Sequence, residues 1–285
     1  MQNLLILVNK PPGISSFDVV YQIRRILKPK KIGHTGTLDP NAEGLMLIVL
    51  NEATKLNPFL VHQTKQYEAI MKLGLKTDTA DIWGEVLETK AIKPFNKDMI
   101  LEVFQSFIGE QTQITPKVSA VKVKGKRLYE YAYKNQDVVL PERTIEITKI
   151  ELIEYTKDTI HFMVDCSKGT YIRTLCEDIA KKLDTLGCMS YLKRLKVGSL
   201  SVDNAYTLAE IEQGNFIYES IYNAIDLPVL EIDDSKSLKD IRDGKPMDLK
   251  IEGDTVLLTQ KASLLAIYKY DDTINKYRCL RGLWE

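Results

Sequence analysis

The chain has 285 residues, and its 39 basic and 39 acidic side chains give a formal net charge of zero. At roughly 150 residues per domain, this length predicts two domains. Hydrophobic residues make up 44% and charged residues 27%, which argues against disorder, collagen and coiled-coil rods. The longest apolar run, residues 45–50, is far shorter than the ~20 residues of a membrane span, and no basic signal-peptide region precedes the first apolar stretch, so we expect a cytoplasmic protein without membrane contact.

Cysteine and histidine usage argues against redox and metal chemistry. The four cysteines form no CxxC pair, and Cys176 lies on an apolar helical face, as expected of a small buried thiol. The three histidines show no metal-ligand spacing. We therefore expect neither a metal ion nor a cofactor.

The neutral total conceals uneven local charge. Residues 1–40 carry six Lys/Arg against two acids, residues 117–134 carry six against one, and residues 168–196 carry seven against three. Residues 203–254 instead hold thirteen acids and five bases. The three basic stretches form a phosphate-binding stripe if they converge on one face, and are solvated surface if they do not; charge alone favours neither interpretation.

The pattern of the first 95 residues predicts strands, one helix and two loops. A strand over 4–8 is followed by a Pro/Gly turn and a helix that Ser16 caps and Pro29 ends. A loop then leads to a buried strand over 45–50, and another strand is predicted over 66–75. In the polar loop that follows, Asp78 and Asp81 are interpreted as stabilising the loop.

The middle of the chain predicts two amphipathic helices around a region of strands. The first helix covers 96–108, strands and loops cover 111–170, and the second helix begins at Thr170 and stops at Gly187. Arg173 lies about 120° from the centre of the second helix's apolar stripe, at ~100° per residue, so it is expected to point away from the core. The TLAE sequence from Thr207 predicts a capping box.

The acidic stretch 227–235 is the predicted domain boundary, which separates residues 1–227 from a β-rich unit, 228–285. This unit has one predicted short helix, 237–244, and strand-like segments at 255–259, 263–270 and 277–284. The last two segments are joined by the turn DDTINK.

The loop GHTGTLDPNAEGL, residues 33–45, concentrates reactive side chains among three glycines. Pro40 fixes the backbone directly after Asp39, and the glycines permit geometries closed to other residues. A carboxylate in such a loop is held in place rather than mobile. A lone Asp-Pro is usually only a turn starter, but the neighbouring His34 and threonines make that reading less adequate.

This loop resembles the active-site motif of the bacterial tRNA pseudouridine synthase B (TruB) family. Five further segments resemble that family in the same order: KPPGISSFD, KQYEA, TDTADIWG, KGTYIRTL and LKRLKVG. The resemblance runs through residues 4–200, and the tail is similar to the family's PUA-type RNA-binding module. It implies a pseudouridine-synthase fold of the α/β (α+β) class, with a mixed, largely antiparallel sheet and a small β-rich C-terminal PUA-like domain.

The resemblance also implies roles for individual residues. Asp39 matches the catalytic aspartate, and Arg173 the arginine paired with it. Among the substrate-binding residues, His34 matches a histidine that helps to displace the target nucleotide, and Tyr67 matches a tyrosine that stacks on the uracil. Tyr171 matches a further substrate contact in the GTYIR segment, and Leu192 an apolar contact in the base pocket. Lys10 matches a lysine in the family's first motif.

Each role has a simpler structural alternative. Tyr67 and Leu192 fit ordinary packing, His34 fits a hydrogen bond within its loop, and Arg173 fits an ion pair with Glu177 at i+4. The sequence also departs from the family pattern, because Val118 stands where a tyrosine is usual. Tyr133 and Leu195 replace a common arginine and a frequent threonine, which puts details of RNA contact in doubt.

The resemblance implies isomerisation of uridine 55 in the T loop of tRNA, with tRNA as partner; we expect no protein partner and a monomeric enzyme. The enzyme must extrude the stacked uridine and then hold the ring by stacking and hydrogen bonds. Whether Asp39 attacks the sugar or base, or removes the 2′ proton, is open at this point. The rival interpretations are a related synthase acting on another RNA, a guide-RNA-dependent enzyme and a non-catalytic RNA-folding module.

Overall fold

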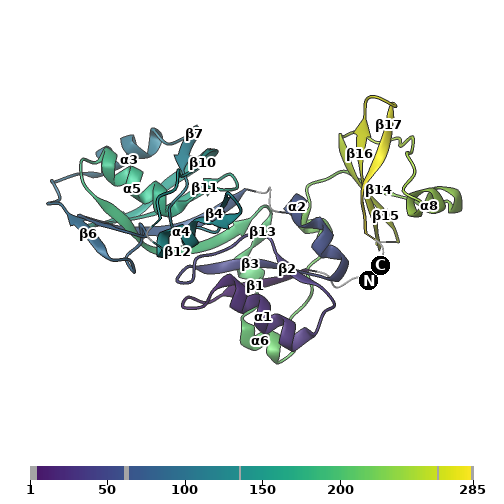
Figure 1. The fold of residues 1–285 in the computed structure, drawn as a ribbon, viewed down its shortest axis with the longest axis horizontal. Helices are drawn as coiled ribbons and strands as arrows, with labels where there is room; N and C mark the ends of the chain where they lie inside the picture. The colour runs from purple at the N-terminus through teal and green to yellow at the C-terminus, as the bar shows by residue number, and fades with distance from the viewer. Residues whose placement is uncertain (1–4, 61–63, 135, 262, 284–285) are drawn as a thin grey trace.

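The computed structural model describes residues 5–60, 64–134, 136–261 and 263–283 (Figure 1). Within these residues a nine-stranded sheet runs in the order β1-β3-β12-β4-β11-β10-β7, with β2 added to β3 and β13 to β12. Its neighbours are antiparallel except for the parallel pair β12 and β3. The predicted mixed, largely antiparallel sheet is therefore confirmed.

The elements have the following bounds. The strands are β1 (Leu5–Lys10), β2 (Ile32–His34), β3 (Glu43–Leu50), β4 (Lys65–Leu73), β5 (Leu75–Thr77), β6 (Val86–Thr89), β7 (Gly109–Ile114), β8 (Lys122–Val123), β9 (Lys126–Arg127), β10 (Glu142–Tyr155), β11 (Thr159–Cys166), β12 (Gly187–Val197), β13 (Leu200–Ser201), β14 (Val229–Glu231), β15 (Thr255–Gln260), β16 (Ser263–Asp271) and β17 (Lys276–Gly282). The helices are α1 (Ser16–Leu27), α2 (Asn57–Leu60), α3 (Lys97–Gln105), α4 (Leu128–Tyr133), α5 (Ile172–Lys182), α6 (Leu208–Glu212), α7 (Ile221–Ala224) and α8 (Ser235–Arg242), with 3-10 turns η1 (Asn51–Leu56) and η2 (Val202–Asn204).

The two halves of the large sheet are covered differently. β1 and β3 are buried on both faces, which explains their continuous apolar runs, whereas β4 and β11 alternate between buried and half-exposed positions. One face of the sheet packs against α1 at the β1–β3 half and against α3 and α5 at the β10–β12 half. The active-site candidates lie on this face, between the two groups of helices.

Several helix bounds differ from the predictions. Helix α3 covers Lys97–Gln105 rather than 96–108, α8 begins at Ser235 rather than 237, and α5 ends at Lys182, so that Gly187 begins β12. Ser15, not Ser16, caps α1, through a reciprocal capping box with Asp18. The Ser16 hydroxyl is buried instead and bonds the backbone N–H and C=O of Leu38, at 2.8 and 2.9 Å. Helix α5 begins at Ile172 rather than Thr170, because the Thr170 hydroxyl bonds the Ser167 carbonyl in the preceding turn.

Other predicted elements are confirmed with shifted ends. The strand predicted over 66–75 stops at Leu73, because Gly74 has a φ of +87° and turns the chain into β5. The capping box at Thr207 is present with Glu210. Leu4 and Trp284, the outer residues of two predicted strands, lie outside the described residues.

The C-terminal residues form a second sheet of order β14-β15-β16-β17. Its hairpin β16–β17 is the one predicted around DDTINK. Leu257, Ile267 and Leu283 belong to the same buried cluster as Leu5 and Leu47 of the large sheet. The two sheets therefore share apolar contacts, although each has a core of its own. No described helix is long and apolar enough to cross a membrane.

Gly44 lies at the closest approach between β3 and β12. Its φ is +102°, and a Cβ added there would lie 2.3 Å from the Arg194 carbonyl oxygen and 2.8 Å from the Arg194 nitrogen. Both obstacles are backbone atoms, which no side-chain rotation can remove. Gly109 has nearly the same φ, +104°, with nothing within 4 Å of an added Cβ.

Gly44→Ala and Gly109→Ala separate backbone strain from steric conflict. We expect Gly109→Ala to lower the free energy of unfolding by about 1–2 kcal/mol, the cost of a left-handed alanine. Gly44→Ala adds a steric conflict of at least ~1–3 kcal/mol, because β3 and β12 must move apart. Urea denaturation measures both, and equal losses would contradict the close approach of the two strands.

Candidate active site

A cleft of about 370 Å³ opens between the halves of the large sheet. It is lined by segments far apart in the chain: residues 35–39 of the glycine-rich loop, 119–121, and 168–173 before and within α5. A smaller hollow of about 90 Å³ has many of the same lining residues and contains Asp39, Tyr67, Tyr171, Arg173 and Leu192. The structure thus brings together five of the seven predicted site residues.

An ion pair lies at the centre of this hollow. Arg173 Nε lies 2.9 Å from Asp39 Oδ2, and a second guanidinium nitrogen lies 3.4 Å from Oδ1. The Arg173 side chain is 4% exposed and the Asp39 side chain 37% exposed, so the carboxylate faces the opening while its partner is buried behind it. Such a pair gives the carboxylate a defined position and orientation.

The burial of Arg173 corrects the expectation that it points away from the core. Its position off the apolar stripe of α5 faces the cleft floor, where it donates to the carbonyls of Thr79 and Val118, each at 2.8 Å. These two carbonyls and the Asp39 carboxylate come from three separate segments, and together they accept the hydrogen bonds of the buried guanidinium. Helical periodicity alone would have placed this guanidinium in solvent. Within the described residues, Asp39 and not Glu177 is its ion-pair partner.

The loop that carries Asp39 is tied down on both sides. Ser16 at the start of α1 bonds the backbone of Leu38, and the Pro40 carbonyl accepts from Gly13 N at 3.0 Å. The ammonium of Lys10 donates to the carbonyls of Pro11, Pro40 and Ala42, at 2.9, 2.9 and 2.6 Å.

Lys10 is completely buried beneath this loop. Its three bonds to backbone carbonyls give it a positioning role, and its burial offers no support for the predicted direct contact with substrate.

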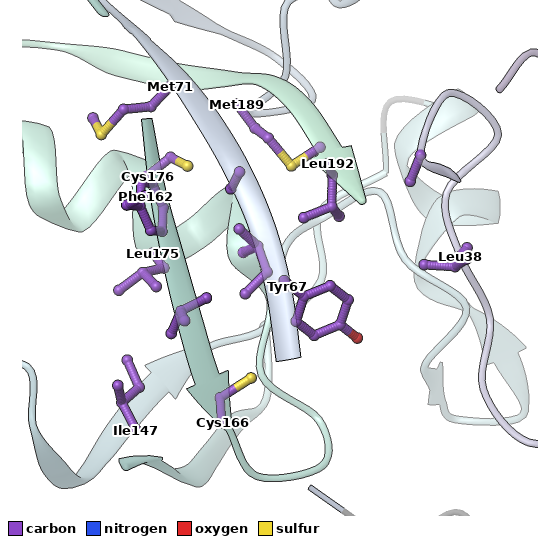
Figure 2. Close-up of a cluster of buried hydrophobic side chains, with 14 of the residues drawn as sticks. Leu38, Tyr67, Met71, Ile147, Phe162, Cys166, Leu175, Cys176, Met189 and Leu192 are labelled. Atoms are coloured by element: carbon purple, nitrogen blue, oxygen red, sulfur yellow. The ribbon is translucent and has the colours of Figure 1, made fainter. Parts of the chain in front are cut away.

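Tyr67 and Leu192 form the apolar side of the hollow. Figure 2 shows the Tyr67 ring projecting from β4 toward the segment with Leu38, and Leu192 on the neighbouring strand β12. Both are largely buried, at 8% and 6% exposed, yet both line the hollow. Burial raises the pKa of the Tyr67 phenol, so the ring stays neutral. The same two side chains therefore both pack in the core and line the hollow.

Tyr171 and His34 have different placements. Tyr171 precedes α5, and its backbone is clamped by the Gln113 side chain, which accepts from Tyr171 N at 2.7 Å and donates to its carbonyl at 3.0 Å. His34 does not line either cavity described above. Its Nδ1 accepts from Gly36 N at 3.3 Å, and burial lowers its pKa, so the neutral ring ties its own loop.

The sequence analysis did not identify Arg194 and Lys65 as residues of the candidate site. Arg194 is 2% exposed; it donates to the carbonyls of Leu45 and Gly36, at 2.7 and 3.2 Å, and its guanidinium also reaches the Tyr67 hydroxyl. Lys65, 8% exposed, lines the cleft. The available signal was strand alternation, since Arg194 and Lys65 each lie two residues from a predicted site residue on the same strand.

The basic stretches converge only in part. Backbone segments from all three approach the cleft, but its cations are Arg173, Arg194 and Lys168 from the third stretch, with Lys65 and Arg143 from outside them.

The loop acids fulfil the predicted structural role. Asp78 accepts from Glu85 N, and Asp81 accepts from the Thr79 hydroxyl and from Trp83 N. No group of metal-ligating side chains occurs among the described residues. Cys176 is fully buried, and burial raises its pKa well above the ordinary value, consistent with an inert thiol.

A larger cleft of about 1050 Å³ lies beside α2, α7 and β17. Asp226 is the charged residue in its lining, and no cation stands beside it there within the described residues. The smaller cleft is the better candidate for chemistry because it holds the paired charges.

The lowered pKa of Lys10 leads us to expect that activity depends on pH. Burial lowers its pKa from 10.5 to about 8, the Asp39 and Glu43 carboxylates oppose this shift, and Arg194 adds to it. The ammonium has three N–H donors for three carbonyls, whereas the neutral amine has two, so the Asp39 loop loses a bond above this pH. We expect kcat/KM to fall as pH rises through about 8.

The stability effect of Lys10 has the opposite sign. Between pH about 8 and 10.5 the unfolded chain holds a proton that the folded chain has released, so this group raises the free energy of unfolding with pH. Burial also lowers the pKa of Lys65 to about 8, so Lys65→Arg serves as the control. In steady-state measurements, kcat/KM of this variant should still fall as pH rises through about 8. A kcat/KM that does not change with pH in this variant would assign the titration to Lys65 instead.

Two family models cover most of the chain. The TruB family pseudouridylate synthase N-terminal domain matches residues 24–172, and the tRNA pseudouridylate synthase B C-terminal domain matches residues 173–230. The second match ends at β14, so most of the C-terminal sheet lies beyond both.

Whole-chain similarities agree with these matches. A tRNA pseudouridine synthase B of Alkaliphilus oremlandii is 47% identical, over 74% of this chain and 70% of that protein. One from Oceanobacillus iheyensis is 41% identical, over 93% of this chain and 91% of that protein. A crystal structure of a Cbf5-Nop10-Gar1 complex matches with a TM-score of 0.70 and 28% identity, over 94% of this chain and 78% of that chain. The chain belongs to the TruB family of pseudouridylate synthases.

Proposed function

We propose that this pseudouridylate synthase acts on tRNA and isomerises uridine 55 of the T loop, with Asp39 as the catalytic carboxylate. The observation that carries the proposal is the ion pair between half-exposed Asp39 and buried Arg173, in a hollow that also contains Tyr67 and Leu192. The choice of tRNA and of position 55 rests on the family and on the names of its relatives.

The site matches the demands of a flipped nucleotide. The uridine must leave its stack, at a cost of a few kcal/mol, before the protein can reach its glycosidic bond. Tyr67 offers an aromatic face worth ~1–3 kcal/mol for a stacked base, and Leu192 an apolar contact beside it. Within the described residues the buried Ser119 hydroxyl of the cleft has no hydrogen-bond partner, so it is available to a polar edge of the uracil.

The reaction balances without an external reagent. The N1–C1′ bond breaks, the C5–C1′ bond forms, N1 gains a proton and C5 loses one to solvent. The protein's task is to hold an ionised carboxylate against the reacting nucleotide while the base rotates. Arg173 supplies this orientation, and Lys10 and Ser16 hold the backbone on either side of Asp39.

We also propose that residues 1–227 form the catalytic domain and that residues 228–285 form a PUA-like RNA-binding unit. The separate four-stranded sheet supports this division, and Lys276 and Arg281 place exposed cations on β17. One chain supplies every group of the hollow, which supports an enzyme that works as a monomer; the proposal places it in the cytoplasm, with its tRNA substrate.

Asp39→Asn tests the catalytic assignment. We expect tritium release from tRNA labelled at C5 of uridine 55 to fall at least about 10³-fold, because the carboxylate is lost while the shape of the site is kept. Filter binding should show tRNA affinity within about threefold of the wild type, since the phosphate contacts remain.

Asp98→Asn is the matched control, because Asp98 is an exposed carboxylate on α3. Its tritium release should equal that of the wild type. Tritium release from uridines elsewhere in the tRNA, but not from position 55, would overturn the assignment of uridine 55 as the target nucleotide. A wild-type protein that anneals tRNA without tritium release would instead favour an RNA-folding module.

Lys276→Gln with Arg281→Gln tests the C-terminal unit without exposing the apolar contacts it shares with the large sheet. Two lost phosphate contacts should reduce the slope of log affinity against log salt by roughly 1.4–1.8, while kcat stays unchanged. The control is Lys97→Gln with Lys157→Gln, two exposed lysines of the large domain. Equal salt slopes for both double variants would contradict RNA binding by β17.

A further inference from the structure

The outer face of α1 exposes two aromatic rings that packing within the described chain does not use. Phe17 is 73% exposed and Tyr21 55% exposed. They lie four residues apart, one turn along the helix, and outside the stripe of its buried residues Ser16, Val19, Val20 and Ile23. Folding of the described chain therefore does not require an aromatic residue at either position.

Cations continue the same face toward the end of the helix. At ~100° per residue, positions 17, 21 and 24 fall within about 60° of one another, and Lys28 follows as the left-handed C-cap directly beyond the helix. Arg24 and Lys28 are exposed, and no acid pairs with either within the described ranges. We call these four side chains the α1 stripe: two aromatics followed by two cations, about 16 Å long at ~1.5 Å per residue.

The α1 stripe begins next to the catalytic loop. Ser16, the neighbour of Phe17, holds Leu38 through two hydrogen bonds, and Leu38 directly precedes Asp39. Figure 1 shows α1 at the edge of the molecule, below β1 and beside α6. The aromatic pair is therefore the end of the α1 stripe that lies nearer in sequence to this contact with the catalytic loop.

We propose that the α1 stripe is an RNA-docking surface for the part of the substrate that flanks the reacting nucleotide. This proposal rests on the proposed function. Phe17 and Tyr21 stack on unpaired bases of the RNA, and Arg24 and Lys28 contact its phosphates. Aromatic rings in line with cations suit a single strand or loop, because every base has a stacking face and every linkage a negative charge.

Charge complementarity decides between RNA and a second protein chain. The core of a protein–protein interface is depleted of charged residues, lysine among them, whereas here both Arg24 and Lys28 continue the line of the rings and match the negative backbone of RNA. The first basic stretch of the sequence, residues 1–40, contributes no cation to the lining of the catalytic cleft. The α1 stripe accounts for part of that charge.

The experiment compares Phe17→Ser with Tyr21→Ser, made together, against the wild type. KM for tRNA and the dissociation constant should rise about tenfold, because stacking is lost, while kcat stays within twofold, because the α1 stripe binds substrate and transition state alike. Phe17→Trp with Tyr21→Phe keeps two aromatic faces and should restore binding. Met99→Ser with Leu101→Ser, at 42% exposed positions on α3, is the matched control and should change neither constant.

The cations are tested by salt dependence. Arg24→Gln with Lys28→Gln should lower the slope of log affinity against log salt by roughly 1.4–1.8, and the aromatic double variant should leave that slope unchanged. Thermal unfolding should be nearly unaffected in both, since all four side chains are exposed.

The outcomes separate this inference from the proposed function. If the wild type releases no tritium from tRNA, the proposed function fails. If the wild type is active and the aromatic double variant keeps its KM and dissociation constant, the docking surface alone is overturned. A wild-type dimer in sedimentation that the aromatic variant converts to a monomer, with unchanged RNA affinity, would identify the face as a contact between copies of this chain and likewise overturn it.

Discussion

The site depends on how one buried guanidinium is satisfied. Arg173 has five N–H donors and a permanent charge, so burial is tolerable only with acceptors arranged around it. The carbonyls of Thr79 and Val118 and the Asp39 carboxylate provide them, each from a different segment. The same bonds that stabilise the buried charge therefore assemble the cleft.

A second buried cation has a comparable role on the opposite side of the cleft. Arg194 donates to carbonyls at both ends of the glycine-rich loop, Gly36 and Leu45. Gly44 permits this arrangement, because β3 passes the Arg194 backbone too closely for any Cβ. Lys10 adds two more bonds to this loop from beneath, to the carbonyls of Pro40 and Ala42. Two buried cations, Arg194 and Lys10, thus hold the backbone of the loop, and a third, Arg173, pairs with the Asp39 side chain, which is turned toward the opening.

Local patterns predicted the elements well and individual side chains less well. The apolar runs of β1 and β3, the alternation of β4 and β11, and the Thr207 capping box all appear as expected, because they depend on neighbours in sequence. Ser16 and Arg173 did not follow their predictions. Helical periodicity counts apolar side chains, and it cannot register a polar acceptor supplied by a loop from elsewhere in the chain.

By itself, the sequence determined the family, the largely antiparallel sheet and a stiff loop that carries Asp39 among glycines, because motif order and short-range periodicity are local properties. Only the tertiary structure decided that Arg173 is buried, that Lys10 lies beneath the loop, and that Arg194 and Lys65 belong to the cleft. The reason is physical. A charged side chain can be buried only where distant segments meet to satisfy it, and that meeting is a property of the fold.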